Sequence, residues 1–281
     1  MIYPFRTALP RHMVPVLAAV AVASACDLTD PLPVEPLIQT DATTYQLVSD
    51  ADGLSTEMKD YGREADLVSD IIRARAPDAR TILDVGCGTG AHARALIDLG
   101  FAVDGIDVEP TFVTIASAKC PEGAFTVADM RTMELEARYD AVMCLFSAIG
   151  YVRSVDTLEL AIHRMSEHLE PGGVLLVDPW FAPGEMDDGH VMVLHAEDAG
   201  RSVVRMSRTV IEGTVSRLEF EYLIGDASGL ERRSETHELG LFTREQMERA
   251  FQRAGLKVER IERTLRTRGI YVGTLETTPA W

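Results

Sequence analysis

The chain has 281 residues, of which 46% are hydrophobic, so it can form one sizeable domain or a domain with an insert. Its formal net charge of −17 argues against a nucleic-acid surface and an anionic membrane surface, because both need clustered lysines and arginines. The four cysteines, Cys26, Cys87, Cys120 and Cys144, form no C-x-x-C pair and no cysteine–histidine cluster. We therefore expect no metal site, and cysteines that pack as small apolar residues in a reducing compartment.

Residues 1–40 are predicted to be an N-terminal extension and linker. Arg6 and Arg11 precede an apolar run that ends at Cys26 and resembles a secretory or lipoprotein signal. The run is too short to span a membrane. The alternative is an extension that folding does not use, and we expect a cytoplasmic protein because the rest of the chain has cytosolic character.

Residues 41–185 alternate between helical periodicity and short β-branched runs. In the first helix, predicted over 60–76, Ala65, Val68, Ile71 and Ile72 share one face. Such alternation predicts β-α-β units and a parallel sheet, hence an α/β fold. Strands are predicted at 81–85, 101–107, 123–130, 139–147 and 174–180, and further helices at 90–100, 110–120 and 157–173, the last with a glycine stop.

Residues 186–242 read differently, as alternating runs separated by turn signals such as Glu212-Gly213. This pattern predicts an antiparallel β meander inserted late in the α/β domain. Residues 243–281 then return to the core. A helix is expected over 243–254, with Thr243 as its N-cap, and two closing strands over 256–264 and 269–276.

Polar and glycine residues follow three consecutive strands, where ligands bind in open α/β sheets. The first strand ends in the loop DVGCGTG, whose Gly86, Gly88 and Gly90 permit positive φ and close approach of a ligand. Their G-x-G-x-G spacing lacks one residue of the dinucleotide pattern G-x-G-x-x-G. A nicotinamide dehydrogenase is the rival that the loop alone leaves open.

Carboxylates accompany each of these strand ends. Asp107, after the second strand, can accept hydrogen bonds from both ribose hydroxyls of a nucleoside. After the third strand, Asp129 can accept from an adenine amino group while Met130 packs on the ring. Taken singly, Asp84, Asp107 and Asp129 could be caps or turn residues and Met130 a core residue. Their order along the chain favours a shared ligand.

These motifs resemble the class I S-adenosylmethionine-dependent methyltransferases. ILDVGCGTG, GIDVEP and VADMRTM are similar to the family's first three strand-end motifs, and YDAVMCLFS and LEPGGVLLV to the next two. The resemblance, over about residues 45–281, implies a Rossmann-like seven-stranded sheet with one antiparallel strand, and S-adenosyl-L-methionine as cofactor.

The same resemblance implies a set of cofactor-binding residues. The three glycines would line the methionine part, Asp84 would bind its amino group, Asp107 the ribose, and Asp129 and Met130 the adenine. The neighbouring residues expected to complete the set are Cys87, Val108, Leu145 and Phe146. Tyr45 and Tyr61 are expected on a lid whose aromatic faces suit a sulfonium, with ordinary helix packing as the alternative for both.

A narrower resemblance concerns the N,N-dimethyltransferases of dTDP-3-amino sugars, of the desosamine and mycaminose type. KDYGREADLV, FSAIGY, HELGLFTREQMERAF and RGIYVG occur here in that family's order. This implies a nucleotide-linked amino sugar as the acceptor and places the β meander on the acceptor side. The chain departs from the family at Tyr151, where several members carry histidine, and in a longer loop between Tyr45 and Tyr61.

The acceptor side has four candidate residues. Tyr151 is the expected catalytic residue, because a phenol can orient an attacking amine. Trp180 and Phe181 would wall the site, and Arg268, in a cluster with Arg263 and Arg266, could bind a pyrophosphate. The alternatives are helix packing for Tyr151, a surface-loop anchor for Trp180 and Phe181, and a solvated face for the arginines. His92 is expected to pack at a helix start.

We therefore expect a methyltransferase that acts on a small molecule, with the amino group of a nucleotide-linked amino sugar as the first hypothesis. Methylation of another small amine or hydroxyl of a natural product is the alternative enzyme activity. A non-catalytic cofactor-binding module or a secreted binding protein is the alternative of another class. We expect neither nucleic acid nor membrane as a partner of the folded domain, and a homodimer stays open.

Overall fold

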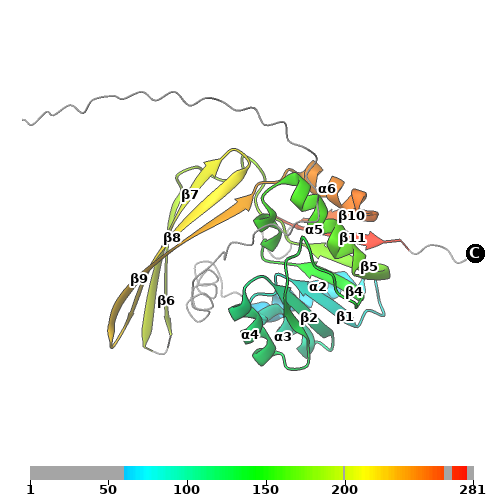
Figure 1. The fold of residues 1–281 in the computed structure, drawn as a ribbon, viewed down its shortest axis with the longest axis horizontal. Coiled ribbons are helices and arrows are strands. Elements are labelled where there is room, and N and C mark those ends of the chain that lie inside the picture. Colours follow the sequence, from blue (N-terminus) through cyan, green and yellow to red (C-terminus); the bar gives the residue numbers. More distant parts are fainter. Residues whose placement is uncertain (1–59, 199, 263–267, 277–281) are drawn as a thin grey trace, which may run out of the picture. The chain divides into compact units, whose positions relative to one another are not determined.

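The computed structural model describes residues 60–198, 200–262 and 268–276, and the account below concerns these residues. Within them the chain forms a seven-stranded sheet of order β10-β11-β5-β4-β1-β2-β3 (Figure 1). Its strands are β1 (Thr81–Val85), β2 (Ala102–Asp107), β3 (Phe125–Val127), β4 (Tyr139–Cys144), β5 (Leu169–Val177), β10 (Leu256–Ile261) and β11 (Ile270–Leu275). Neighbouring strands from β3 to β5 are parallel, and β11 runs antiparallel to both β5 and β10. This confirms the predicted α/β sheet with one antiparallel strand.

Helices cover both faces of this sheet. The described helices are α2 (Tyr61–Arg73), α3 (Ala91–Asp98), α4 (Pro110–Lys119), α5 (Val155–Glu167) and α6 (Arg244–Arg253), with a short 3-10 helix, η1 (Ala148–Val152). One apolar cluster packs α5 and α6 against residues such as Val142 and Leu175, and the other packs α2 and α3 against Ala141 and Val174. Because successive strand residues point to opposite faces, one strand serves both clusters.

The second sheet is the predicted antiparallel meander. It consists of β6 (Val191–Asp198), β7 (Arg201–Glu212), β8 (Val215–Asp226) and β9 (Gly229–Gly240), hydrogen-bonded in that order. Buried Val203, Tyr222 and Ile224 form its own apolar cluster. Both sheets belong to one compact unit of the chain.

Local signals explain where the helices begin. Ser154 and Thr243 cap α5 and α6, each in a capping box in which the cap side chain and the third helical residue exchange hydrogen bonds with backbone N–H groups. The predicted N-cap Thr243 is therefore confirmed. The first helix buries Ala65, Val68 and Ile72, as its periodicity predicts.

Several predicted boundaries were wrong, in part because single residues adopt backbone conformations that the sequence pattern does not reveal. We expected helix to 173 and strand from 174, but α5 ends at Glu167 and β5 begins at Leu169. Gly172 has φ +86 at an irregularity in the β4–β5 register, so the predicted glycine stop lies inside the strand. Strand β4 ends at Cys144 because Phe146 and Ser147 have φ +55 and +62, and β3 covers only 125–127 of the predicted 123–130.

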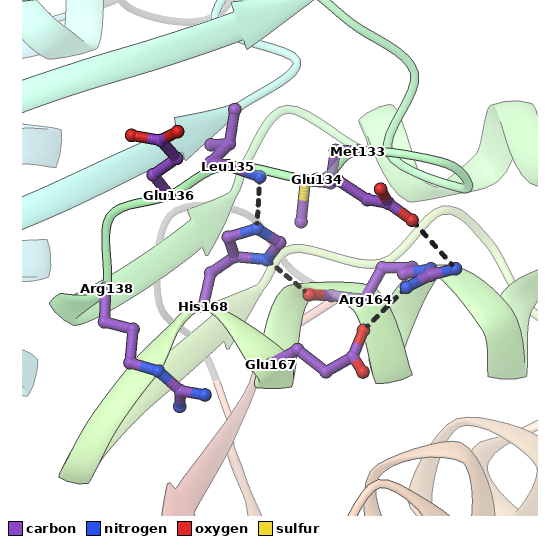
Figure 2. Close-up of a pocket in the computed structure, with 8 residues that line it drawn as sticks. All are labelled: Met133, Glu134, Leu135, Glu136, Arg138, Arg164, Glu167 and His168. Atoms are coloured by element: carbon purple, nitrogen blue, oxygen red, sulfur yellow. Dashed lines mark hydrogen bonds and ion pairs between the residues drawn. The ribbon is translucent and has the colours of Figure 1, made fainter.

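His168 connects the segment before β4 to the end of α5, at the edge of the sheet where β4 and β5 begin. Its Nε2 accepts the Leu135 N–H at 2.9 Å and its Nδ1 donates to the Arg164 carbonyl at 2.7 Å, which together require the neutral ring (Figure 2). The surrounding cavity measures about 270 Å³ and includes Glu134, Arg138 and Glu167. It lies at the amino ends of β4 and β5, opposite the predicted ligand-binding edge. No helix in the described residues has the length and apolarity needed to cross a membrane.

His168→Ala should lower the free energy of unfolding by about 1–3 kcal/mol, because a buried donor and acceptor each lose their partner. Urea denaturation measures this loss. His163→Ala on the same helix is the control, since that side chain is 55% exposed and should change stability by less than about 0.5 kcal/mol. Equal losses in the two variants would contradict the role assigned to His168.

Candidate active site

The glycine loop after β1 is held in a conformation that only glycine adopts without strain. Gly86, Gly88 and Gly90 have φ +75, +54 and +73. A Cβ at Gly86 would lie 2.9 Å from the Ala148 Cβ, and one at Gly90 would lie 3.0 Å from the Ala116 Cβ. A Cβ at Gly88 would meet no atom within 4 Å. The absence of a side chain at Gly86 and Gly90 therefore permits close packing, whereas a side chain at Gly88 would point into open space.

Asp107 braces this loop from the end of β2. Its Oδ2 accepts the Gly88 N–H at 2.8 Å and its Oδ1 accepts the Glu109 N–H at 3.0 Å. Each carboxylate oxygen retains a second lone pair that can accept from a hydroxyl. Burial raises the pKa of Asp107, although the backbone N–H donors oppose that shift. The predicted ribose-binding carboxylate thus stands at the loop and has capacity for two further donors.

The environment of the loop is electronegative. Asp84 is buried at the end of β1. Burial raises the pKa of the Cys87 thiol, and the charges of Asp84 and Asp107 raise it further. The pKa of the Cys144 thiol is raised for the same reasons, with burial the largest. Such a field favours a ligand that carries positive charge.

The third strand end differs from expectation in its bonding. Asp129 does follow β3, but both its carboxylate oxygens bind the Arg131 guanidinium, at 2.5–3.0 Å, and Oδ1 also accepts the Arg131 N–H at 2.8 Å. To bind an adenine amino group, Asp129 would have to share or exchange these bonds. Sequence reasoning missed Arg131, although the DMR triplet contains it. Val108 and Met130 are partly buried beside these ends.

Helices α2 and α3 bring Tyr61 next to the residues that follow the glycine loop. The Tyr61 ring meets the His92 ring edge-on at 5.0 Å, and His92 Nε2 lies 2.6 Å from Glu64 Oε2. His92 is buried, in agreement with the expected packing role, and Glu64 is a partner that sequence reasoning missed. Tyr45, Arg263 and Arg266 lie outside the described residues.

The ends of β4 and β5 are joined by Arg268. Its Nε donates to the Pro179 carbonyl at 3.0 Å and its Nη2 to Ser147 Oγ at 2.9 Å. The guanidinium also lies over the rings of Phe181 and Trp180, 4.7 and 5.3 Å from their centroids. The predicted acceptor-side residues Trp180, Phe181 and Arg268 are therefore in contact. The predicted cofactor residues Leu145 and Phe146 come directly after β4, and Leu145 is buried.

Tyr151 and Trp180 both bind the second sheet. Tyr151 Oη lies 2.7 Å from His237 Nδ1, and the Trp180 indole N–H donates to Ser216 Oγ at 2.8 Å. His237 Nε2 in turn lies 3.2 Å from Glu235 Oε2. His237 and Glu235 were missed in the sequence analysis. These two polar residues stand at alternate positions of a predicted strand, on its core-facing side, and this placement could have marked them as candidates.

Comparisons with known proteins agree with this arrangement. A methyltransferase domain model matches residues 82–173. The chain is 38% identical, over 83% of its length and 89% of the relative's, to the dTDP-3-amino-3,6-dideoxy-alpha-D-glucopyranose N,N-dimethyltransferase of Streptomyces fradiae. It is 36% identical to the dTDP-3-amino-3,4,6-trideoxy-alpha-D-glucopyranose N,N-dimethyltransferase of Streptomyces venezuelae, over 76% of this chain and 91% of that one.

A solved structure of an amino pentose methyltransferase from Micromonospora echinaspora, with S-adenosylmethionine bound, is similar with a TM-score of 0.75 and 38% identity. The match covers 83% of this chain and 96% of that one. These similarities confirm the family resemblance on which the cofactor prediction depended. The chain belongs to the class I S-adenosylmethionine-dependent methyltransferases, within the family that includes these sugar N,N-dimethyltransferases, and is an enzyme of that type.

Proposed function

We propose that this enzyme transfers methyl groups from S-adenosylmethionine to the amino group of a dTDP-linked amino sugar, twice on the same nitrogen. The observation that carries this proposal is the extent of the similarity to the Streptomyces fradiae enzyme, 38% identity over 83% of the chain, which includes the second sheet. The net charge of −17 disfavours nucleic acid and anionic membranes as partners, whereas the pyrophosphate of a small nucleotide-linked substrate needs only local cations such as Arg268. The proposal places the enzyme in the cytoplasm.

For the cofactor we propose the residues at the ends of β1, β2 and β3. The open space at Gly88 and the two remaining lone pairs of Asp107 support a nucleoside at this edge. The negative field of Asp84 and Asp107 supports the cationic methionine part. S-adenosylmethionine, when bound, supplies an activated methyl carbon. Tyr61, Cys87, Val108, Met130, Leu145 and Phe146 complete the proposed set, with Asp129 on the adenine if Arg131 gives up part of its pairing.

Catalysis then depends on how the chain holds the acceptor. Alignment of the amine with the methyl carbon can contribute about 7–11 kcal/mol of the barrier, without any change in chemistry. Tyr151 is proposed to orient the amine, while Trp180 and Phe181 exclude water around it. Arg268 already donates to Pro179 and Ser147 and stacks on two rings, so a pyrophosphate would have to bind its remaining donors.

Gly88→Ala should weaken S-adenosylhomocysteine binding by at least about tenfold, because its methyl group enters the space assigned to the ligand. The left-handed backbone costs the fold only about 1–2 kcal/mol. Gly100→Ala is the matched control, with φ +94 and no atom within 4 Å of the added Cβ. Isothermal titration measures both affinities; equal weakening in the two variants would refute the assignment of Gly88.

Asp107→Asn should weaken the same binding about 10- to 100-fold, because a charged acceptor of two hydroxyls is lost. Ribose hydroxyls bind the carboxylate form, so wild-type affinity should fall as pH decreases. Burial raises the pKa of Asp107, so this fall begins at higher pH than for an ordinary aspartate. The Asn variant should show no such pH dependence. A fall of the same size in both proteins would assign the effect to another group.

A panel of acceptors tests the proposed substrate. Wild-type enzyme is incubated with S-adenosylmethionine and one of three acceptors: a dTDP-3-amino sugar, a dTDP-4-amino sugar, or a dTDP-sugar that carries only hydroxyls. Mass spectrometry measures the masses of the products. We expect one and then two methyl groups on an amino sugar and none on the hydroxyl sugar. Methylation of the hydroxyl sugar would replace the amine proposal by its alternative.

A further inference from the structure

A series of three polar side chains, Tyr151, His237 and Glu235, leads from η1 into the second sheet. Tyr151 Oη lies 2.7 Å from His237 Nδ1, and His237 Nε2 lies 3.2 Å from Glu235 Oε2. The side chains of His237 and Glu235 are each only 6% exposed. Burial of a histidine–carboxylate pair is costly unless its members are bonded, and here they bond to each other in line with the predicted catalytic phenol.

The hydrogen-bond pattern fixes the direction of this series. The Tyr222 hydroxyl donates to Glu235 Oε2 at 3.1 Å. Burial and the charge of Glu235 raise the pKa of Tyr222, so that hydroxyl keeps its proton and Glu235 serves as the acceptor. Glu235 can then also accept the His237 Nε2–H, which leaves Nδ1 as the acceptor for the Tyr151 O–H.

The backbone around Tyr151 is set against β9 by close contacts. Helix η1 lies between Ser147 and Arg153, which have φ +62 and +60. A Cβ at Gly150 would lie 2.9 Å from Leu239, and one at Gly240 would lie 2.9 Å from the Arg153 backbone. Arg153 also pairs with Glu238 at 2.7 Å. Strained backbone held by its surroundings is common at functional sites, and here it fixes the position of Tyr151 relative to His237.

We propose that His237, held by Glu235, positions Tyr151 and takes up the proton that the substrate amine releases during methyl transfer. This inference rests on the proposed function. The amine nitrogen forms a bond to the methyl carbon as the carbon–sulfur bond breaks, with its electron pair left on sulfur. An N–H proton of the amine then passes to Tyr151 Oη while the Tyr151 proton passes to His237 Nδ1. The resulting imidazolium is stabilised by the Glu235 carboxylate and returns its proton to solvent between turnovers.

The groups that face His237 come from four elements. Tyr151 approaches from η1, Glu235 from its own strand, and Tyr222 and the Phe220 ring, 5.0 Å away, from β8. The Arg205 guanidinium from β7 lies over Phe220, 4.8 Å from the ring centroid. The Glu235 carboxylate contacts His237 directly, and Arg205 contacts the Phe220 ring and also interacts with Tyr222.

His237→Asn tests the proton step in the full-length enzyme. An Asn amide oxygen can take the place of Nδ1 as the acceptor from Tyr151, but the amide does not take up a proton. We expect kcat to fall on the order of 100-fold with KM nearly unchanged. The relay predicts that wild-type kcat rises with pH, and this rise should be absent from the variant. Glu235→Gln should lower kcat less, because its amide oxygen can still accept from Nε2.

A second histidine–glutamate pair on the same sheet supplies the matched controls. His195 Nε2 lies 3.3 Å from Glu197 Oε1, at the same two-residue spacing, but both side chains are exposed. His195→Asn and Glu197→Gln should leave kcat and its pH profile unchanged. A purely structural role for His237 predicts instead lower stability, with the wild-type pH profile of kcat retained, and this result would overturn the proposal.

The acceptor panel separates this inference from the proposed function. If the enzyme methylates a different amine, the assignment of a sugar substrate fails. The kcat values of the same variants, measured with that amine, then test the proton step. Unchanged kcat in His237→Asn with any accepted amine overturns the relay alone. If wild-type enzyme methylates no amine, both proposals fail.

Discussion

The rest of the site depends on the hydrogen bond from the Gly88 N–H to the Asp107 carboxylate. It joins the loop after β1 to the end of β2 at 2.8 Å, in a segment where three glycines with positive φ leave the backbone few other restraints. The same carboxylate must stay ionised to serve as an acceptor, although burial opposes its charge. The two backbone N–H donors offset part of that cost before any ligand binds. The loop is therefore organised by a group that also has capacity to recognise the ligand.

A second constraint joins the two sheets. The ends of β4 and β5 contact the meander through the Tyr151–His237 and Trp180–Ser216 hydrogen bonds, and Gly150 and Gly240 allow the backbones to approach. Arg268 fastens the two strand ends to each other, through Ser147 and Pro179. The meander is thus bonded to the edge at which β4 and β5 end, and His237 on β9 holds the Tyr151 hydroxyl. The role proposed for Tyr151 therefore depends on β9 as well as on η1.

The sequence predicted what local patterns determine. Periods of two and 3.6 residues located the strands and helices, and the glycines and carboxylates at three strand ends carried the family resemblance that predicted the cofactor. The residue pairs that the sequence missed are separated by long stretches of chain: Tyr151 and His237 meet only because β9 returns to η1, and Glu64 reaches His92 only through helix packing. Arg131 is local to Asp129, but no pattern predicts that its side chain folds back on that carboxylate. The start of β5 was wrong because Gly172 in a bulge and glycine after a helix have the same sequence signal.

Negative charge at the site also solves a problem of selectivity. An enzyme that binds an activated methyl group must keep its own nucleophiles from reacting with it. Cys87 lies in the glycine loop and Cys144 at the end of β4, yet burial and the charges of Asp84 and Asp107 raise the pKa of both thiols. Since the thiolate is the reactive form, the raised pKa lowers the reactivity of both cysteines. The carboxylates that favour a cationic cofactor therefore also suppress the thiols as competing nucleophiles, which suits an enzyme whose proposed acceptor is a neutral amine.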